Sequence, residues 1–154
     1  MVEFSTVDLG RQYPGKIDDF ARARNSFLEN LPDNHYVLFV DSDEEAPLML
    51  LDHIKRLEPE HPYYWVRRIE LSNDNYFAGC NPNFKPALVS SRVRFTNRIH
   101  EKIVPKNPHG IIQIPIIHNH RGTRQYDGIS RLRAGRLGHY WQGAKKMVEV
   151  ARGR

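Results

Sequence analysis

Four acidic side chains follow one short apolar run. Asp41, Asp43, Glu44 and Glu45 come directly after Tyr36 to Val40 (YVLFV), which is typical of a strand buried on both faces. Two aspartates one residue apart at the end of such a strand place hard oxygen ligands side by side, which suits Mg²⁺ or Mn²⁺ held together with substrate phosphates. The alternative is an acidic helix start, because carboxylates in a first turn offset the helix dipole. The position directly after the strand favours a metal site.

Two helices are expected on either side of this strand. Asp18 or Asp19 can cap the first, and Pro47 fits the first turn of the second. The apolar residues of the first recur at helical spacing: Phe20, Ala23, Phe27, Leu28 and Leu31. Those of the second form an inner stripe: Leu48, Leu51, Ile54 and Leu57. The acids therefore lie between a strand and a helix, where open α/β sheets bind their ligands.

The rest of the chain to residue 122 favours short strands. Val2 to Val7 can form one, and Tyr63 to Leu71 is aromatic and β-branched enough for another. Ser72 to Pro86, rich in Asn, Pro and Gly, is expected to be a loop. Further strands are expected at Ala87 to Ser90 and Ile111 to His118. The predicted class is mixed α/β, with a single domain of ordinary globular composition.

Charge and composition exclude several classes of protein. No apolar run approaches a membrane span, the first residues lack a secretory signal, and the single cysteine, Cys80, excludes a disulfide framework and is expected to be inert. These features favour a cytoplasmic protein. The net charge of +5 is concentrated from Arg121 onward, where nine Lys or Arg face two acids. This basic segment, 123–154 and partly helical, suits phosphates of a lipid carrier, a membrane surface or nucleic acid. The alternative is a solvated face that keeps the protein in solution.

Four segments in order resemble glycosyltransferase family 2, whose enzymes are inverting and have the GT-A fold. Phe20 to Asn25 (FARARN) and Tyr36 to Glu44 (YVLFVDSDE) resemble the family's "D-F-x-x-A-R-N" helix and "W-I-L-F-L-D-A-D-E" strand. Val93 to Glu101 (VRFTNRIHE) is similar to its "(V/A)-R-F-x-G-R-(I/V)-H-E" segment, and Pro115 to Gly122 (PIIHNHRG) to its "P-I-x-H-x-x-R" segment. The resemblance covers roughly Ile17 to Gly122. It implies a GT-A-like, Rossmann-like mixed sheet with flanking helices over residues 1–122.

The resemblance also implies roles for individual residues. Asp43 would ligate Mn²⁺ or Mg²⁺ bridging the donor's two phosphates, and Asp41 would contact the ribose or the metal. Arg24 and Asn25 would lie near the nucleotide of a nucleotide-diphosphate sugar. Without the resemblance, Arg24 reads as an exposed helix arginine.

Glu101 is the expected general base. An inverting transfer needs one carboxylate, opposite the leaving group, to take the proton of the acceptor hydroxyl. The resemblance places an acid at this point in the chain. The alternative is a surface glutamate paired with Lys102 or Arg98.

A histidine near the end of the last strand is expected to complete the metal site. His118 fits the family segment better, and His120 is the alternative. We expect only one of the two to turn toward the site.

The N-terminal part departs from the family. Only Met1 to Lys16 precedes the first helix, where the family has about two βα units that read the nucleobase. This predicts a minimal version, a fragment of a longer chain, or a homo-oligomer in which another subunit completes the donor pocket. The glycine of the family segment is also replaced by Asn97.

The predicted function is transfer of a sugar from a nucleotide diphosphate to a glycan or lipid-linked acceptor, in the cytoplasm and at the membrane surface. A degenerate nucleotide-sugar-binding module is the first alternative. A basic nucleic-acid-binding protein is the second, and it rests on charge alone.

Overall fold

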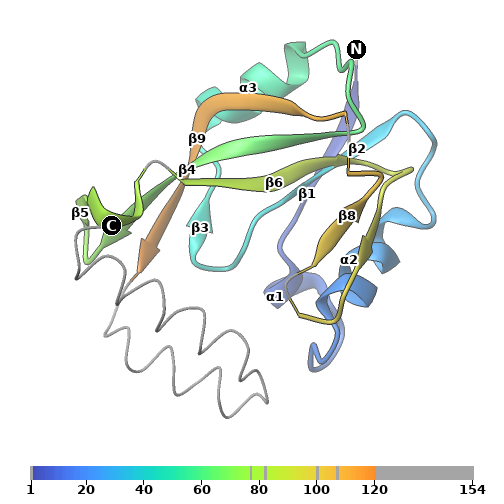
Figure 1. Ribbon diagram of the computed structural model, residues 1–154, viewed down its shortest axis with the longest axis horizontal. Helices are drawn as coiled ribbons and strands as arrows, with labels where there is room; N and C mark the ends of the chain where they lie inside the picture. Colours follow the sequence, from blue (N-terminus) through green and yellow to red (C-terminus); the bar gives the residue numbers. More distant parts are fainter. Residues whose placement is uncertain (1, 77, 82, 100, 107, 121–154) are drawn as a thin grey trace.

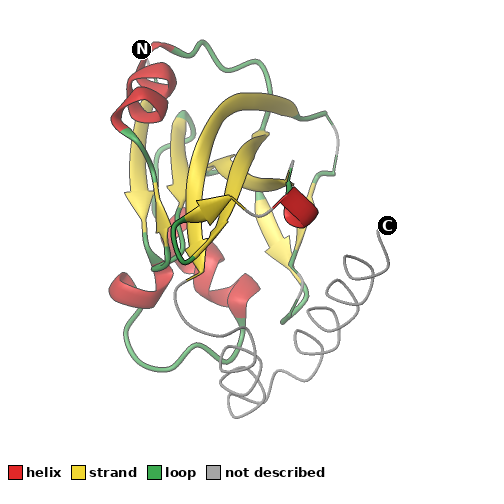
Figure 2. Cartoon of the chain, turned by 90° about the vertical axis from the view of Figure 1, so that its left-hand side faces the viewer, coloured by secondary structure: helices red, strands yellow, loops and turns green. Residues whose placement is uncertain are grey.

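The main sheet mixes parallel and antiparallel strands. A computed structural model describes residues 2–76, 78–81, 83–99, 101–106 and 108–120. Within them the main sheet has seven strands, and Figure 2 shows that it is curled. Their order is β1 (Glu3–Val7), β2 (His35–Phe39), β6 (Asn83–Ser90), β4 (Tyr63–Ser72), β9 (Gly110–His120) and β3 (Glu44–Glu45), with β5 (Asn75–Tyr76) paired to β4 (Figure 1).

Strand direction brings several strand ends to one edge of this sheet. β1 runs parallel to β2, and β4 runs parallel to β9, while β6 is antiparallel to both β2 and β4. The carboxyl ends of β1, β2, β4 and β9 therefore share an edge with the amino end of β6. The short β3 is antiparallel to β9 and begins at the same edge. Side chains from distant parts of the sequence meet there.

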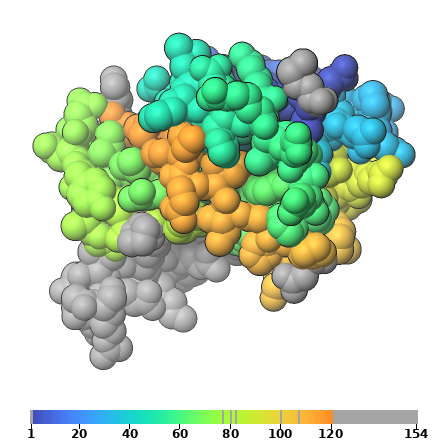
Figure 3. Space-filling view, turned by 90° about the horizontal axis from the view of Figure 1, so that it is seen from above, coloured from blue at the N-terminus to red at the C-terminus, as the bar shows by residue number. Residues whose placement is uncertain are grey.

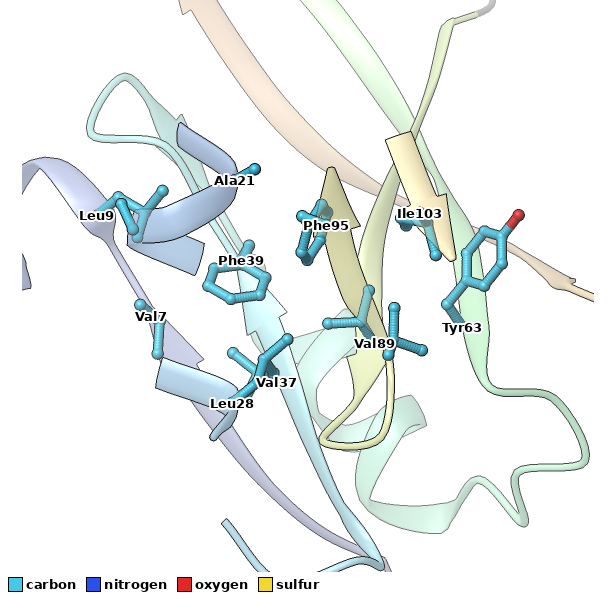
Figure 4. Close-up of a cluster of buried hydrophobic side chains, with 12 residues drawn as sticks. Val7, Leu9, Ala21, Leu28, Val37, Phe39, Tyr63, Val89, Phe95 and Ile103 are labelled. Carbon is cyan, nitrogen blue, oxygen red and sulfur yellow. The ribbon is translucent and has the colours of Figure 1, made fainter. Parts of the chain in front are cut away.

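Both faces of the sheet are covered. On one face, α1 (Leu9–Gln12), α2 (Phe20–Leu28) and a second sheet of β7 (Arg94–Thr96) and β8 (Lys102–Val104) enclose a cluster that includes Phe39 and Phe95. Their rings meet edge to face, with centroids 5.8 Å apart (Figure 4). On the other face, α3 (Leu48–Arg56) packs against β9, and Figure 3 shows the two side by side.

The predicted buried strand is confirmed. In β2, Val37 and Phe39 belong to the cluster beneath α2, whereas Tyr36 and Leu38, with Val40 just after the strand, belong to the cluster beneath α3. Because alternate residues of a strand point to opposite faces, a run that is apolar throughout needs cover on both sides. The first predicted helix is also confirmed: the Asp19 side chain caps it through the Arg22 amide at 2.9 Å.

The inner stripe of α3 differs from the prediction. Leu50 and Ile54, one helical turn apart, are buried, whereas Leu51 and Leu57 are only partly buried. Leu48 is 78% exposed, so the prediction that it belongs to the inner stripe is wrong. It lies two residues from Leu50, which is about 200° around a helix and on the opposite side.

The predicted loop from Ser72 to Pro86 is wrong over much of its length. Asn73 and Asp74 have positive φ angles of 46° and 66° and form the tight turn of a hairpin between β4 and β5. A short 3₁₀ helix, η1 (Ala78–Cys80), follows, and β6 begins at Asn83. Pro86 lies within β6, opposite Trp65, where the register with β4 shifts, and an irregularity of this kind tolerates a residue without an N–H.

Some predictions concern residues outside this description. The basic segment 123–154, its expected helix, and His100 of the family-like segment lie there, as does the side chain of Cys80. In the part of the chain that is described, no helix is long and apolar enough to cross a membrane.

Candidate metal centre

Asp43, His118 and His120 come together at the shared edge of the sheet. Asp43 lies in the turn between β2 and β3, and the two histidines end β9. One potential ligand atom from each of the three lies within 4.8 Å of the others, so the group is compact enough to hold a metal ion. Nε2 of His118 lies 2.8 Å from Oδ2 of Asp43.

Both histidines contact one buried carboxylate. Oε2 of Glu70 lies 2.7 Å from Nδ1 of His118 and 2.8 Å from Nε2 of His120. Glu70 is the β4 partner of His118 across the parallel ladder, which explains why their side chains share a face. The expectation that only one histidine turns toward the site is wrong. Residues two apart in a strand point to the same face, and the two rings lie with centroids 4.0 Å apart.

The charges of this cluster shift the pKa values of its members. Burial opposes ionisation of Glu70 and Asp43, but His118 outweighs it and lowers the pKa of both carboxyls, with His120 and Arg68 also acting on Glu70. Burial likewise opposes the charged form of His118, yet its bonds to Asp43 and Glu70 raise its pKa to about 9. Without a metal, a proton on His118 therefore holds the two carboxylates together.

Asp41 is paired with two cations instead of joining the histidine group. Oδ2 of Asp41 lies 3.3 Å from Nζ of Lys85, and Oδ1 lies 3.8 Å from the Arg24 guanidinium. Burial acts to raise the pKa of Asp41, but these two cations lower it overall. Its roles as a metal ligand and as a donor contact stay predictions. The Asp41 carboxylate remains 43% exposed, open to a ligand from solvent.

Glu44 holds the acidic turn in shape. Its side chain is fully buried and accepts hydrogen bonds from the Asp41 amide at 2.9 Å, from Lys85 at 2.6 Å and from Arg68 at 2.9 Å. The turn is also fastened from the other side, where Ser42 donates to the Asp8 carboxylate at 2.8 Å. These bonds explain the sharp reversal after β2. The alternative interpretation, in which these acids begin a helix, is wrong, because α3 begins only at Leu48 and its first turn, within the described residues, holds no acidic residue.

Arg24 connects Glu101 to Asp41. Its Nε lies 3.3 Å from the Glu101 carboxylate, and its guanidinium lies over the rings of Phe39 and Phe95, 5.0 and 5.4 Å from their centroids. The Arg24 side chain is 12% exposed, so Arg24 is not the exposed helix arginine of the alternative interpretation. Glu101 pairs with Arg24, whereas the alternative interpretation paired it with Lys102 or Arg98.

The side-chain amide of Asn25 joins α2 to β7. Its Nδ2 donates to the Phe95 carbonyl at 2.9 Å, and its Oδ1 accepts from the Phe95 amide at 2.8 Å. The structure gives Asn25 this positioning role, and its contact with a donor stays a prediction. By fastening β7, Asn25 also fixes the ring that lies under Arg24.

These contacts form one continuous chain of charges, which we call the edge network. Its members are Glu101, Arg24, Asp41, Lys85, Glu44, Arg68, Glu70, His118, His120 and Asp43, each in contact with at least one other. It contains five carboxylates and three permanently charged bases. With both histidines neutral, the excess is two negative charges, which one divalent cation would neutralise. The network therefore matches the predicted divalent cation in charge.

Four members of this network were not predicted as site residues: Glu44, Arg68, Glu70 and Lys85. One signal was available for two of them. Arg68 and Glu70 alternate with Tyr64 and Val66 on one face of the predicted strand, so charged residues continue an otherwise apolar face. Lys85 lay in the segment that was expected to be a loop, which hid its position on β6.

Comparison with known proteins adds no relative. No protein-family model and no curated protein matches the chain. Membership of glycosyltransferase family 2 therefore stays a prediction from the four sequence segments.

Proposed function

We propose that this protein is an inverting glycosyltransferase that moves a sugar from a nucleotide diphosphate to an acceptor hydroxyl with the help of a divalent cation. One observation carries the proposal: Asp43 and His118 converge at the same edge where Asp41, Arg24 and Glu101 are joined by ion pairs. Residues 77 positions apart in the sequence thus belong to one network. The predicted α/β class supports a GT-A-like core, because the mixed sheet brings these strand ends together.

The residues at the edge divide into two groups with different tasks. Asp43 and His118 would hold the cation, which when bound supplies Lewis-acid stabilisation of the departing nucleotide diphosphate. Asp41, kept ionised by Lys85 and Arg24, would orient the donor. Lys85 and Arg24 also place two positive charges next to Asp41, and these would attract the negatively charged phosphates of a donor.

Glu101 would act as the base. As the acceptor oxygen bonds to the anomeric carbon and the bond to the diphosphate oxygen breaks, the hydroxyl proton passes to the Glu101 carboxylate. Arg24 fixes the direction of this carboxylate through the contact of its Nε with Oε1 of Glu101 at 3.3 Å. The acceptor that we propose is a glycan or a lipid-linked saccharide, reached in the cytoplasm at a membrane surface by way of the basic segment 123–154.

A nucleotide-sugar screen tests the donor and the metal together. Thermal unfolding is followed with UDP-, GDP- and dTDP-sugars, each with and without Mn²⁺. We expect a rise in Tm for one nucleotide only, and only when Mn²⁺ is present. Asp43→Asn should abolish this rise, whereas the exposed Glu58→Gln should keep it. A rise of equal size in Asp43→Asn would contradict the proposed site.

Substitution of Glu101 tests the chemistry separately from binding. Glu101→Gln keeps the size of the side chain but cannot take a proton. We expect turnover to fall at least a hundredfold, in line with the usual contribution of a general base, with donor affinity changed less than threefold. Near-normal turnover would show that the base is another group.

A second candidate is a binding module that holds the metal and nucleotide without turnover. The Arg24–Glu101 ion pair favours it, because Arg24 occupies one oxygen of the carboxylate that would have to take the proton. Mn²⁺-dependent nucleotide binding by calorimetry, with no product from any sugar in the screen, would support this candidate over the enzyme. The nucleic-acid alternative rests on the segment 123–154, which lies outside the described residues.

A further inference from the structure

Both histidines at the end of β9 are held by other side chains, although a site with a single histidine ligand would need only one of them held. His118 and His120 point to the same face, and one carboxylate, Glu70, contacts both. Glu70 is itself 2% exposed and is held from its other oxygen by Arg68 at 2.6 Å and by Asn83 at 2.7 Å. This buried carboxylate, held by an ion pair to Arg68 and a hydrogen bond from Asn83, is therefore fixed in place where it contacts the two imidazoles.

The contacts of Glu70 decide which nitrogen each histidine offers. An ionised carboxylate can only accept hydrogen bonds, so Nδ1 of His118 must carry a proton toward Glu70. In the metal-free protein Nε2 carries a second proton toward Oδ2 of Asp43, 2.8 Å away, and a divalent cation would take the place of that proton. His120 contacts Glu70 through Nε2, which leaves Nδ1 for a ligand. Metal-binding histidines are commonly oriented by a carboxylate in this way.

We infer that the divalent cation is bound by both histidines together with Asp43, and that Glu70 is the positioning residue that fixes both imidazoles. The inference rests on the metal site of the proposed function but not on sugar transfer. Two imidazoles and one carboxylate suit a first-row transition metal such as Mn²⁺, Co²⁺ or Zn²⁺ better than Mg²⁺, which prefers oxygen ligands. It therefore also narrows the choice between Mn²⁺ and Mg²⁺.

The first test uses calorimetric titration of the full chain with Mn²⁺ alone and with Mg²⁺ alone. His120→Asn removes one imidazole from a side chain that is 22% exposed, so the fold should tolerate it. We expect Mn²⁺ binding to weaken at least tenfold in His120→Asn and Mg²⁺ binding to change less than threefold. Equal Mn²⁺ affinity in wild type and His120→Asn would overturn the inference. Absence of Mn²⁺ binding in the wild type would instead contradict the proposed metal site itself.

The second test addresses Glu70. Glu70→Gln keeps the shape, but it removes the charge and gives one end an NH₂ group that cannot accept hydrogen bonds. Loss of such an outer carboxylate commonly weakens metal binding ten- to a hundredfold, and we expect a loss in this range for Mn²⁺. Glu45→Gln is the matched control, because Glu45 is exposed and sits one residue from the buried Glu44. Circular dichroism confirms that each variant is folded before titration.

Nitrogen NMR supplies a readout that a purely structural role would not move. Zn²⁺ is diamagnetic and shifts the resonance of a ring nitrogen that binds it. We expect ring nitrogens of two histidines to shift in the wild type, assigned with the His118→Asn and His120→Asn variants. A single shifted histidine would overturn the two-histidine site. In Glu70→Gln, unchanged shifts and unchanged affinity would overturn the positioning role of Glu70.

Discussion

Glu44 is a buried carboxylate with three donors, and its substitution should be costly. Glu44→Gln removes the fully buried charge that Lys85 and Arg68 both face, and leaves those two partly buried cations without that partner. Breaking a buried ion pair in this way typically costs about 3–5 kcal/mol. We expect a loss of this order in the free energy of unfolding, measured by urea denaturation. The neighbouring Glu45→Gln should change it by less than about 0.5 kcal/mol, as usual for an exposed position. Similar values for the two variants would show that the Glu44 contacts contribute little.

The sequence distinguished these two glutamates poorly. Asp41, Asp43, Glu44 and Glu45 read as one acidic run, yet each has a different environment in the fold. Glu44 is buried because β3 pairs with β9 opposite His118, a long-range register that no local pattern encodes. Arg24 was placed near the site only by resemblance, since its partner Glu101 is 77 residues away. Residue types and spacing predicted which chemistry is present, and tertiary pairing decided which atom faces which.

His118 should make the stability of the metal-free protein depend on pH. Its pKa is raised from 6.5 to about 9 by folding, so its stabilising contribution is complete below pH 6.5 and is lost as the pH rises through about 9. The shift corresponds to a loss on the order of 3 kcal/mol. Urea denaturation with a chelator, between pH 6 and 9.5 at constant ionic strength, measures it. The difference between wild type and His118→Gln isolates this group from the other histidines. A difference that does not change with pH would contradict the assignment.

At the scale of elements, α2 and β7 depend on one asparagine. Asn25→Ala removes both hydrogen bonds to the Phe95 backbone and leaves that buried backbone unpaired at one edge. We expect a loss of about 1–3 kcal/mol in the free energy of unfolding and faster hydrogen exchange at the Phe95 amide. Asn30→Ala, at an exposed position just after α2, is the control and should have almost no effect. If Asn25→Ala changed nucleotide affinity but not stability, the donor-contact role would be favoured over the structural one.

Elements with a clear local period were predicted well, and the others were not. β2 and α2 follow from an apolar run and a capped helical stripe, which need no distant partner to be recognised. β6 was partly missed because Pro86 and the polar residues before it are typical of loops. β4 supplies its hydrogen-bonding partner, with a shift of register that accommodates the proline. When a strand is stabilised mainly by pairing with a neighbouring strand, its own residues predict it only weakly.

For the whole molecule, the edge network joins several elements at one edge of the sheet, and it holds more negative than positive charges. Its members come from α2, β3, β4, β6, β9, the turn between β2 and β3 and the loop before β8. With both histidines neutral they carry two more negative than positive charges. In the absence of a metal, the proton on His118 offsets part of that excess. A divalent cation would replace this proton and connect Asp43 in the turn to the end of β9. Metal binding should therefore stabilise the entire fold.

This stabilisation can be measured directly. A ligand that binds only the folded state adds about 2.7 kcal/mol at a concentration one hundred times its Kd. For a chain of 154 residues this corresponds to a rise in Tm of about 5–10 °C. We expect Mn²⁺ to raise the Tm of the wild type by this amount at pH 7.5. The rise should be smaller at pH 6, because protons compete more strongly with the ion for His118 as the pH falls. Asp43→Asn should show little rise at either pH, and Glu58→Gln should match the wild type. Hydrogen exchange should slow most in β3 and the end of β9, since the ion joins these to the acidic turn. A rise in Tm without added protection there would mean that Mn²⁺ binds elsewhere on the protein.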